Sequence, residues 1–404
     1  MPHLLPLSLL RRRPGRIRPE LGPLRSALER LGDPQLASPS VLVVGTNGKG
    51  STAAMLSSLL RAHGVRVGLT TSPHLVSVTE RVRIDGEDVT RTELERHLHR
   101  LDDFPDLTFF EALTAAAYLA FADAGVEVAV LEAGMGGTWD ATRTAKSALA
   151  GITNVGSDHR AWLGETARER ARDKGGPLRA AELAVLGPQM RADLVPALEA
   201  PGAVEAASLV GLEPVGDHWV EVSWDGHRVA VGPPLAGEHQ LGNLHLALAL
   251  ARGAALLGIA PPLKPRTVER SLEEVRWPGR LSVVRIGGRE IVVDGAHNRE
   301  SAEALAVFLG RMPGRHSLLF SCLADKPVQE MARVLRPAVA EVALVEMADD
   351  RAMTMESMAA AFPGAIRCEN VEVALERLPD PVVAAGSLRL VGRLLARAAE
   401  GGTA

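Results

Sequence analysis

A glycine-rich turn between an apolar run and a helical pattern constrains the fold of this chain more than any other feature. Its sequence is GTNGKGS, residues 45–51, and it directly follows the apolar run Val41–Val44. A turn in this place lets backbone N–H groups and the positive end of a helix approach phosphate oxygens, while a lysine reaches the outer phosphates. Here the lysine is Lys49, and Gly50 delays the expected hydroxyl to Ser51. The segment therefore predicts a phosphate-binding loop rather than a plain turn with a solvated lysine.

Short apolar runs alternate with helical patterns from residue 41 to about residue 200, which predicts an α/β sheet with crossover helices. The predicted strands are Val41–Val44, Val126–Glu132, Leu149–Thr153 and Leu183–Leu186. The predicted helices are Ser51–His63, Thr92–Leu101, Phe110–Ala124 and Glu165–Arg172. Further along, apolar and polar residues alternate on both sides of Asp225-Gly226, which predicts a hairpin over Trp219–Val231. Strong helical periodicity then covers Asn243–Leu257.

The best signal for a domain boundary is the proline-rich segment 260–265, followed by Trp277-Pro278-Gly279. A short helix is predicted between them, over Thr267–Val275. The pattern then restarts, with strands predicted at Leu281–Ile286, Glu290–Val293, Ser317–Phe320 and Glu341–Val345 and helices at Ser301–Arg311 and Val328–Leu335. A chain of 404 residues is expected to hold two or three domains. We place a first domain at residues 1–276 and a smaller α/β domain at residues 277–404.

The composition excludes several classes of protein. With 46% apolar and 23% charged residues the chain is typical of globular proteins, and its net charge of −4 provides no basic field for nucleic acid or anionic lipid. The two cysteines, Cys322 and Cys368, are too few for a disulfide framework and are expected to be buried hydrophobes in a reducing compartment. Arg11–Arg13 follow the apolar N-terminal run, whereas an export signal carries its charge before that run. No apolar stretch reaches the 18 residues of a membrane span. We expect a soluble, cytoplasmic protein.

Lysine is rare in this chain. Lys+Arg total 45, and the five lysines stand at positions 49, 146, 174, 264 and 326. Lys174 lies one predicted helix beyond His159, the last residue of the strand end ITNVGSDH at 152–159. A desolvated lysine can lose its proton and become reactive, which arginine essentially never does. The alternative is that both residues merely decorate a helix surface.

Other strand ends carry groups that suit a nucleotide. Glu132 ends an apolar strand and is followed by glycines, and a carboxylate in that place beside a phosphate loop commonly holds Mg²⁺. In the second domain, Asp294 and His297 follow a strand, where ligands bind in open α/β sheets. Arg280 stands just past the boundary, where domain closure would bring a guanidinium to a phosphate. Taken alone, each of these residues has an ordinary structural explanation.

Taken together, the segments resemble the folate branch of the Mur ligase superfamily, folylpolyglutamate synthase and dihydrofolate synthase. The motifs that carry the resemblance follow the family order over nearly the whole chain: GTNGKGS (45–51), TSPHL (71–75), ERVRI (80–84), TFFEALT (108–114), LEAGMGGTWDAT (131–142), ITNVGSDH (152–159), HQLGN (239–243), WPGRL (277–281), DGAHN (294–298), Asp325-Lys326 and GSLRLVG (386–392). The resemblance implies an α/β protein with a P-loop-containing, Mur-ligase-type central ATPase domain that holds a pteridine or folate pocket. A smaller Rossmann-like glutamate-ligase domain would follow it.

The implied activity is ATP-dependent ligation of L-glutamate to a carboxylate of dihydropteroate or a reduced folate, through an acyl phosphate, by a monomer. Resemblance places ATP against Gly45, Thr46, Asn47, Gly48, Lys49, Gly50, Ser51, Asn243, Arg280, Asp294 and His297. It places two Mg²⁺ ions among Ser72, Glu132, His159 and Lys174. The residues implied in catalysis are Lys49, His159, Lys174 and Arg280. Lys174 matches a lysine that CO₂ carbamylates in this family, which turns an amine into a carboxylate able to bind the second Mg²⁺.

On the acceptor side, the resemblance points to Thr108, Phe109, Phe110, Asp140, Glu20, Leu21 and Gly22. Phe110 would stack on the pterin, and Asp140 would pair with its amino-imino edge through two hydrogen bonds. Plain core packing is the alternative for the two phenylalanines. Whether the acceptor is dihydropteroate, a reduced folate or both stays open.

Two other functions are less consistent with the sequence. A cell-wall ligase acting on a UDP-sugar peptide is disfavoured because TFFEALT and TSPHL belong to the folate branch. A binding protein whose domains close on ATP without ligation is disfavoured by the intact set Lys49, Glu132, His159 and Lys174.

Overall fold

The computed structural model describes residues 6, 9, 12, 18–216 and 219–401. Most of the N-terminal run on which the argument against an export signal rests, with Arg11 and Arg13, therefore lies outside the described residues. By its contacts the chain forms two units. The first is Met1–Pro234 with Gln240–Arg276, and the second is Leu235–His239 with Trp277–Ala404. The proline-rich boundary signal does not predict that the pentapeptide Leu235–His239 packs with the second unit.

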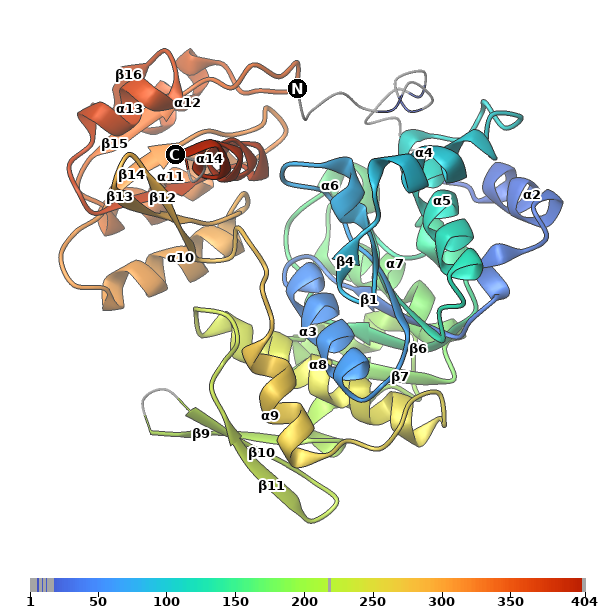
Figure 1. Ribbon diagram of the computed structural model, residues 1–404. Helices are drawn as coiled ribbons and strands as arrows, with labels where there is room; N and C mark the ends of the chain where they lie inside the picture. Colours follow the sequence, from blue (N-terminus) through green and yellow to red (C-terminus); the bar gives the residue numbers. More distant parts are fainter. Residues whose placement is uncertain (1–5, 7–8, 10–11, 13–17, 217–218, 402–404) are drawn as a thin grey trace. The chain divides into compact units, whose positions relative to one another are not determined.

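The first unit is built on an eight-stranded sheet, in the order β4-β3-β2-β5-β1-β6-β7-β8, in which β3 runs antiparallel to both of its neighbours, β2 and β4, and the remaining pairs are parallel (Figure 1). Its strands are β1 Ser40–Val44, β2 Val67–Thr70, β3 Val82–Ile84, β4 Glu87–Asp88, β5 Val128–Glu132, β6 Ser147–Ile152, β7 Leu183–Leu186 and β8 Val204–Glu205. A separate antiparallel sheet consists of β9 Gly211–Val215, β10 Trp219–Trp224 and β11 His227–Val231. The hairpin predicted around Asp225-Gly226 is confirmed, and both turn residues have positive φ, as that turn requires.

The helices of the first unit cover both faces of the large sheet. They are α2 Gly22–Arg30, α3 Lys49–Ala62, α4 Arg91–His99, α5 Phe109–Asp123, α6 Arg160–Leu163, α7 Ala167–Ala180, α8 His239–Leu256, whose first residue belongs to the second unit, and α9 Pro265–Glu273. Short 3₁₀ turns lie at η1 Pro34–Leu36, η2 Val78–Arg81, η3 Ala141–Thr144, η4 Ala192–Leu198 and η5 Ala206–Ser208. Successive side chains of a strand point to opposite sides of the sheet, so neighbouring residues contact helices on different faces. Leu42 and Val44 pack with α5 and α7, whereas Gly151 is covered by Leu250 of α8.

The second unit is a smaller α/β sheet in the order β12-β13-β17-β14-β15-β16. Its strands are β12 Ser282–Ile286, β13 Arg289–Val293, β14 Ser317–Phe320, β15 Val342–Val345, β16 Ile366–Cys368 and β17 Val382–Ala385. Its helices are α10 Arg299–Arg311, α11 Val328–Ala338, α12 Met355–Ala361, α13 Val371–Arg377 and α14 Leu388–Gly401. Only the edge strand β12 runs antiparallel. The predicted strands and helices of this part are confirmed, but β16, β17 and α12–α14 were not predicted.

One predicted boundary is wrong in a way that matters for the site. The helix predicted over Glu165–Arg172 continues to Ala180 and includes Lys174, Gly175, Gly176 and Pro177. Glycine and proline weaken an isolated helix, which is why the pattern predicted an earlier end. Packing decides otherwise, since a Cβ at either glycine would collide with Leu198 or Thr138. The glycines allow α7 to approach its neighbours closely.

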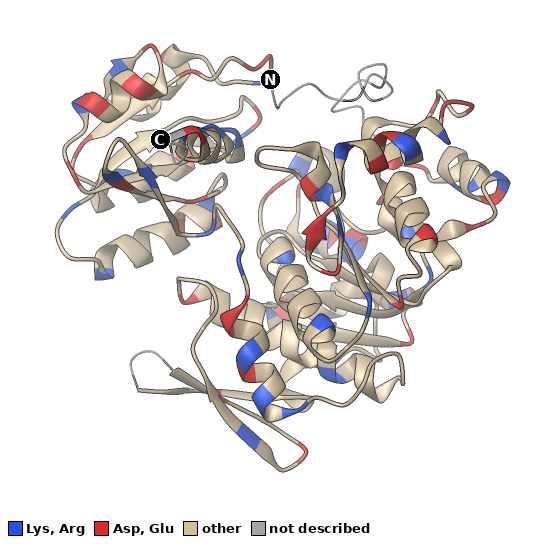
Figure 2. Cartoon of the chain, in the orientation of Figure 1, with Lys and Arg blue, Asp and Glu red and all other residues tan. Residues whose placement is uncertain are grey.

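Charged residues of both signs are interspersed over each unit (Figure 2), in keeping with the small net charge of −4. Among the described residues no helix is both long and apolar enough to cross a membrane. Both cysteines are buried and unpaired, as expected from the sequence.

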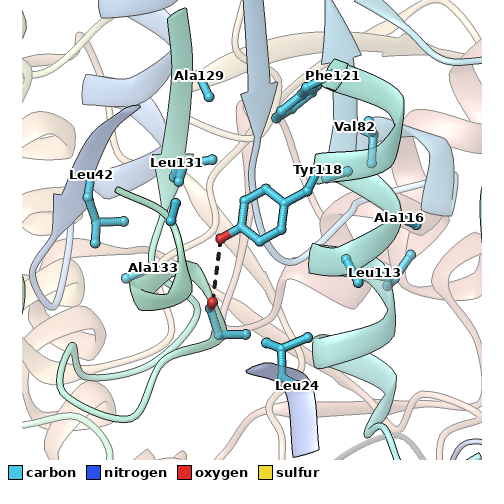
Figure 3. Close-up of a cluster of buried hydrophobic side chains, with 14 of the residues drawn as sticks. Leu24, Leu42, Val82, Leu113, Ala116, Tyr118, Phe121, Ala129, Leu131 and Ala133 are labelled. Carbon is cyan, nitrogen blue, oxygen red and sulfur yellow. Dashed lines mark hydrogen bonds between the residues drawn. The ribbon is translucent and has the colours of Figure 1, made fainter. Parts of the chain in front are cut away.

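The core of the first unit contains one polar side chain that ties α5 to the segment after β5. Tyr118 is buried, and its ring reaches from α5 toward Ala133 (Figure 3). Its hydroxyl donates to the carbonyls of Thr142 at 3.2 Å and Ala141 at 3.4 Å. The hydrogen bonds hold η3, which begins directly after Asp140, against the helix that carries Phe110.

We predict that Tyr118→Phe lowers the free energy of unfolding by about 1 kcal/mol, because the buried hydrogen bonds of the hydroxyl are lost while the ring still fills the core. Urea denaturation followed by circular dichroism measures this loss. As a control for packing, Tyr118→Leu should cost clearly more, because it also leaves a cavity. An unchanged midpoint in Tyr118→Phe would show that the hydroxyl contributes nothing.

Candidate active site

The loop after β1 has the geometry of a phosphate-binding loop. Gly45 and Gly48 have φ of +145° and +84°, a region that favours glycine. A Cβ at Gly45 would collide with Thr153, and one at Gly48 would collide with the amide of Asn243. The loop thus follows a path that only glycine can take, and it delivers the chain into α3 at Lys49.

The neighbouring strand end holds this loop in place. Thr153 donates to the carbonyl of Asn47 at 2.6 Å, and Asn154 both accepts from the N–H of Asn47 at 3.1 Å and donates to its carbonyl at 3.2 Å. The hydroxyl of Thr46 accepts from the N–H of Gly156 at 2.8 Å. Sequence reasoning gave Thr153 and Asn154 no task, although their motif ITNVGSDH was recognised. Their role in holding the loop depends on the adjacency of β1 and β6, which the sequence alone does not show.

Three polar side chains of the loop region are arranged as a phosphate ligand requires. The ammonium of Lys49 donates to the carbonyl of Thr46 at 3.0 Å, so it folds back over the loop. Ser51 Oγ and Asn243 Oδ1 are buried and have no hydrogen-bond partner among the described residues. Buried polar atoms are nearly always paired in native proteins. The two orphaned oxygens therefore fit a site completed by a bound ion and nucleotide.

A carboxylate lies at the same edge of the sheet. Glu132 ends β5, which pairs in parallel with β1, so that Glu132 lies opposite Val43. It is buried and accepts from the N–H of Ser72 at 3.0 Å. Ser72 and Glu132, both expected near Mg²⁺, are thus brought together one strand away from the loop.

Lys174 is fully buried beneath the loop. Its Nζ donates to the carbonyl of Gly45 at 3.1 Å. Burial, and then the charge of Lys49, lower its pKa to about 7, although Asp173 and Asp158 act in the opposite sense. Burial also raises the pKa of Asp173, which accepts from the N–H of Gly137 at 2.8 Å. A substantial fraction of Lys174 is therefore a neutral amine near pH 7.

His159 occupies a special backbone position. Its φ of +59° is unusual for a residue with a side chain and directs the chain into α6. Its Nε2 lies 3.8 Å from the carboxylate of Asp158, and about a third of the side chain is exposed. Within the described part of the chain, no group of three or more His, Cys, Asp or Glu residues is positioned to hold a metal ion, so a metal here would need serine, phosphate or modified-lysine oxygens as well.

The residues expected to hold the pterin meet around the loop after β5. The ring of Phe110 covers Gly134, where a Cβ would lie 2.5 Å from its Cζ. Thr108 caps α5 through the N–H of Glu111 at 3.3 Å. Asp140 accepts from the N–H groups of Met135 at 2.9 Å and Thr142 at 3.0 Å.

Asp140 is therefore part of the loop's own structure. Its carboxylate is buried, and this burial raises its pKa, although the hydrogen bonds act in the opposite sense. Of the N-terminal candidates, Leu21 is buried before α2, Gly22 begins that helix, and Glu20 forms an ion pair with Arg18 at 3.7 Å.

In the second unit, the remaining nucleotide candidates cluster after β13. Asp294 accepts from the N–H groups of Leu281 at 3.0 Å and Ala296 at 2.8 Å. Arg280 donates to the carbonyl of Gly279 at 3.0 Å and lies over Gly295. The ring nitrogen Nδ1 of His297 lies 2.7 Å from the carbonyl of Gly295. His239, which sequence reasoning did not select, joins this cluster: burial lowers its pKa, Asp294 raises it and Arg280 lowers it.

Comparison with known proteins identifies the family. Residues 43–168 match the Mur ligase middle domain and residues 279–391 match the Mur ligase glutamate ligase domain. The dihydrofolate synthase/folylpolyglutamate synthase of Mycobacterium tuberculosis is 34% identical over 92% of this chain and 83% of that protein. The chain belongs to the folylpolyglutamate synthase/dihydrofolate synthase family. This family consists of ATP-dependent ligases of the Mur ligase type, so the predicted α/β fold class and enzyme class are confirmed.

Solved structures of the family share the fold. The folylpolyglutamate synthase of Mycobacterium tuberculosis complexed with ADP superimposes with a TM-score of 0.87 at 31% identity, over 96% of each chain. A bifunctional folylpolyglutamate synthase/dihydrofolate synthase with Mn, AMPPNP and L-glutamate bound superimposes with a TM-score of 0.83 at 28% identity, over 94% of each chain. ATP and a divalent metal ion are thus the cofactors of this family fold. The Haloferax volcanii relative, named a probable bifunctional folylpolyglutamate synthase/dihydropteroate synthase, is 34% identical over 92% of this chain, which spans only 44% of that protein.

In this family member, the shape of the phosphate loop should control nucleotide binding. Gly48→Ala should weaken ADP binding at least tenfold, because the new Cβ meets Asn243 and the residue must hold φ near +84°. Calorimetric titration with Mg-ADP measures this. Gly64→Ala is a matched control, since Gly64 has φ of +85° and open space around it, and it should bind ADP as the unaltered protein does. Equal affinities in both variants would contradict a role for the loop.

Proposed function

We propose that this protein joins L-glutamate to a carboxylate of dihydropteroate, a reduced folate or both, at the expense of ATP. The observation that carries the proposal is the phosphate loop with its two orphaned oxygens, Ser51 Oγ and Asn243 Oδ1, beside the Ser72–Glu132 pair. The named activities of the relatives, which match nearly the whole chain, supply the substrate class.

The chemistry has two steps. An acceptor carboxylate oxygen attacks the γ-phosphorus of ATP, which gives an acyl phosphate and releases ADP. The amine of L-glutamate then attacks the acyl carbon, an amide bond forms, inorganic phosphate leaves and the amine loses a proton. Neither step needs a nucleophilic side chain, because positioning and neutralisation of phosphate charge are what phosphoryl transfer mainly requires.

The residues of the loop suit this task. The backbone N–H groups of residues 45–51 and the N-terminus of α3 would bind the phosphates, and Lys49 would leave the Thr46 carbonyl to reach the outer phosphate. Thr153 and Asn154 would keep the loop preorganised. In the second unit, Arg280, Asp294 and His297 would contact ATP, with Arg280 supplying positive charge to the phosphates.

The donor set fits a divalent cation. Glu132, Ser72 and Ser51 supply the oxygen atoms that Mg²⁺ prefers, together with phosphate oxygens, and His159 would approach from the end of β6. When bound, such an ion would withdraw charge from the γ-phosphate during transfer. Glu132 is already oriented for this role by the N–H of Ser72.

We propose further that CO₂ carbamylates Lys174. The neutral amine would attack CO₂, form the carbamate and release a proton, which would place a carboxylate for a second metal ion below the loop. Burial and a pKa of about 7 supply the neutral amine that this step needs. Arginine cannot replace lysine in this step, because a guanidinium does not deprotonate.

The acceptor pocket would be formed around Phe110, Phe109, Thr108 and Asp140. Phe110 would stack on the pterin, and Asp140, held by Met135 and Thr142, would present its carboxylate to the amino-imino edge. Glu20, Leu21 and Gly22 would line it from the N-terminal side. A monomer in the cytoplasm is the form that we propose for the enzyme.

The activity is tested by coupled measurement of ADP release. Dihydropteroate, tetrahydrofolate and one-carbon tetrahydrofolates are each assayed with and without L-glutamate. We expect ADP release that requires both L-glutamate and at least one of these acceptors, with the amide product confirmed by mass spectrometry. Failure of every acceptor to support glutamate-dependent turnover would refute the proposed reaction.

The carbamate proposal predicts that Lys174→Arg folds but loses most turnover. In the unaltered enzyme, removal of dissolved CO₂ should lower turnover, and bicarbonate should restore it. The dissolved CO₂ concentration needed for half-restoration should rise by more than about a hundredfold as the pH falls from 8 to 6, because carbamate formation releases a proton and protons also compete with CO₂ for an amine whose pKa is about 7. Near-normal turnover in Lys174→Arg would rule the carbamate out.

A further inference from the structure

Two residues of the recognised motifs TSPHL and ERVRI have no role in the reaction described so far. They are His74 and Arg81, both in the segment between β2 and β3. The proposed function accounts for the phosphates and the pterin but leaves the acceptor carboxylate, the atom group that reacts, without a binding residue.

Arg81 is held in a defined orientation. Its Nε donates to Nδ1 of His74 at 2.9 Å. Because arginine Nε always carries hydrogen, the accepting Nδ1 is unprotonated, and the imidazole is the neutral tautomer with hydrogen on Nε2. The guanidinium carbon also lies 5.4 Å from the centre of the Phe109 ring, at cation–π distance. Two contacts from different elements therefore orient the guanidinium.

The loop that carries His74 is itself braced. The carboxylate of Glu80 accepts from the N–H groups of Leu75, Val76 and Ser77 at 2.7, 2.8 and 2.6 Å. At its base, the N–H of Thr71 donates to the carbonyl of Arg81 at 3.3 Å. The carboxylate of Glu80 thus braces the backbone of the loop that carries His74.

In the first unit, the His74–Arg81 pair lies between the candidate metal ligands and the expected pterin pocket. At one end, Ser72 contacts Glu132, the candidate metal ligand. At the other end, Phe110 covers Gly134, only two residues further along the chain, which is at most about 7 Å. Arg81 contacts a residue close in sequence to each end, because His74 follows Ser72 by two residues and Phe109 directly precedes Phe110. An acceptor with its pterin on Phe110 and its carboxylate near the metal edge would extend past Arg81.

We propose that Arg81 binds a carboxylate of the acceptor and that His74 is a positioning residue that holds the guanidinium for this contact. An arginine fork matches a carboxylate in geometry and charge. The inference rests on the proposed function, because it assigns the carboxylate end of that acceptor. Two sources share this chemistry: the carboxylate that reacts, present in both dihydropteroate and tetrahydrofolate, and the second carboxylate that only the glutamyl group of tetrahydrofolate provides.

The test is steady-state kinetics of Arg81→Gln and Arg81→Lys with each acceptor. Arg81→Gln should raise the KM for an acceptor about 10- to 100-fold, the range of one lost charge-assisted contact, while the KM values for ATP and L-glutamate stay within about twofold. Arg81→Lys should recover only part of the loss, because an ammonium has no fork. An effect on both acceptors identifies the reacting carboxylate, and an effect on tetrahydrofolate alone identifies the second one.

The positioning role of His74 is tested by a double-mutant cycle. His74→Ala should raise the acceptor KM several-fold in the unaltered background and have little further effect when Arg81 is already glutamine. His74→Gln, which keeps an acceptor for Arg81 Nε, should restore most of the loss. Arg91→Gln is the matched control, since Arg91 lies on α4, half exposed and paired with Glu95 at 2.8 Å, and it should leave every KM unchanged.

The result that overturns the inference is an unchanged acceptor KM in Arg81→Gln with an unaltered circular dichroism spectrum. An equal rise in all three KM values would also overturn it, because that pattern indicates general damage to the site. If the unaltered enzyme shows no acceptor-dependent turnover, the proposed function fails first. Calorimetric binding of dihydropteroate and of tetrahydrofolate to Arg81→Gln, each compared with the unaltered protein, then decides the Arg81 contact separately: about tenfold weaker binding of either acceptor supports it, and equal binding of both refutes it.

Discussion

The site depends on one steric constraint: the loop after β1 must carry its backbone N–H groups close to phosphate, and this requires that no Cβ intervene. Gly45 and Gly48 meet it by lying against Thr153 and Asn243, where a side chain would collide. The same closeness lets Thr153 and Asn154 hydrogen bond to the loop and hold it in one shape. Other parts of the site are then positioned by their relation to the loop, such as Glu132 on the adjacent strand and Lys174 beneath it.

The burial of Lys174 follows from that arrangement. A charged ammonium in an apolar interior is costly, and a lysine responds by losing its proton more readily. Its pKa of about 7 reflects burial first and the nearby charge of Lys49 second. Two glycines beside it, Gly175 and Gly176, let α7 approach the rest of the unit closely enough to bury it. The two glycines lower the helix propensity of α7 at these positions, but they allow the close packing that excludes water from the amine of Lys174.

The acceptor side shows a different balance between structure and ligand. Asp140 and Thr108 were expected to face the pterin, yet each also has a structural task, since Asp140 supports the turn after β5 and Thr108 caps α5. A side chain that already accepts hydrogen bonds from the backbone is held rigidly, which favours precise presentation to a ligand. Such second tasks depend on side-chain geometry, and the linear pattern of residues did not reveal them.

The sequence by itself determined the class of fold, the phosphate loop, the hairpin and most of the helices and strands, because hydrophobic periodicity and turn residues are local properties. Motifs in order also indicated the family. Only the tertiary structure decided that α7 continues through Lys174, that Leu235–His239 belongs to the second unit, and that Thr153, Asn154, His239 and the His74–Arg81 pair lie where they do. These features arise from contacts between residues far apart in the chain, and a local pattern carries no information about which strands become neighbours.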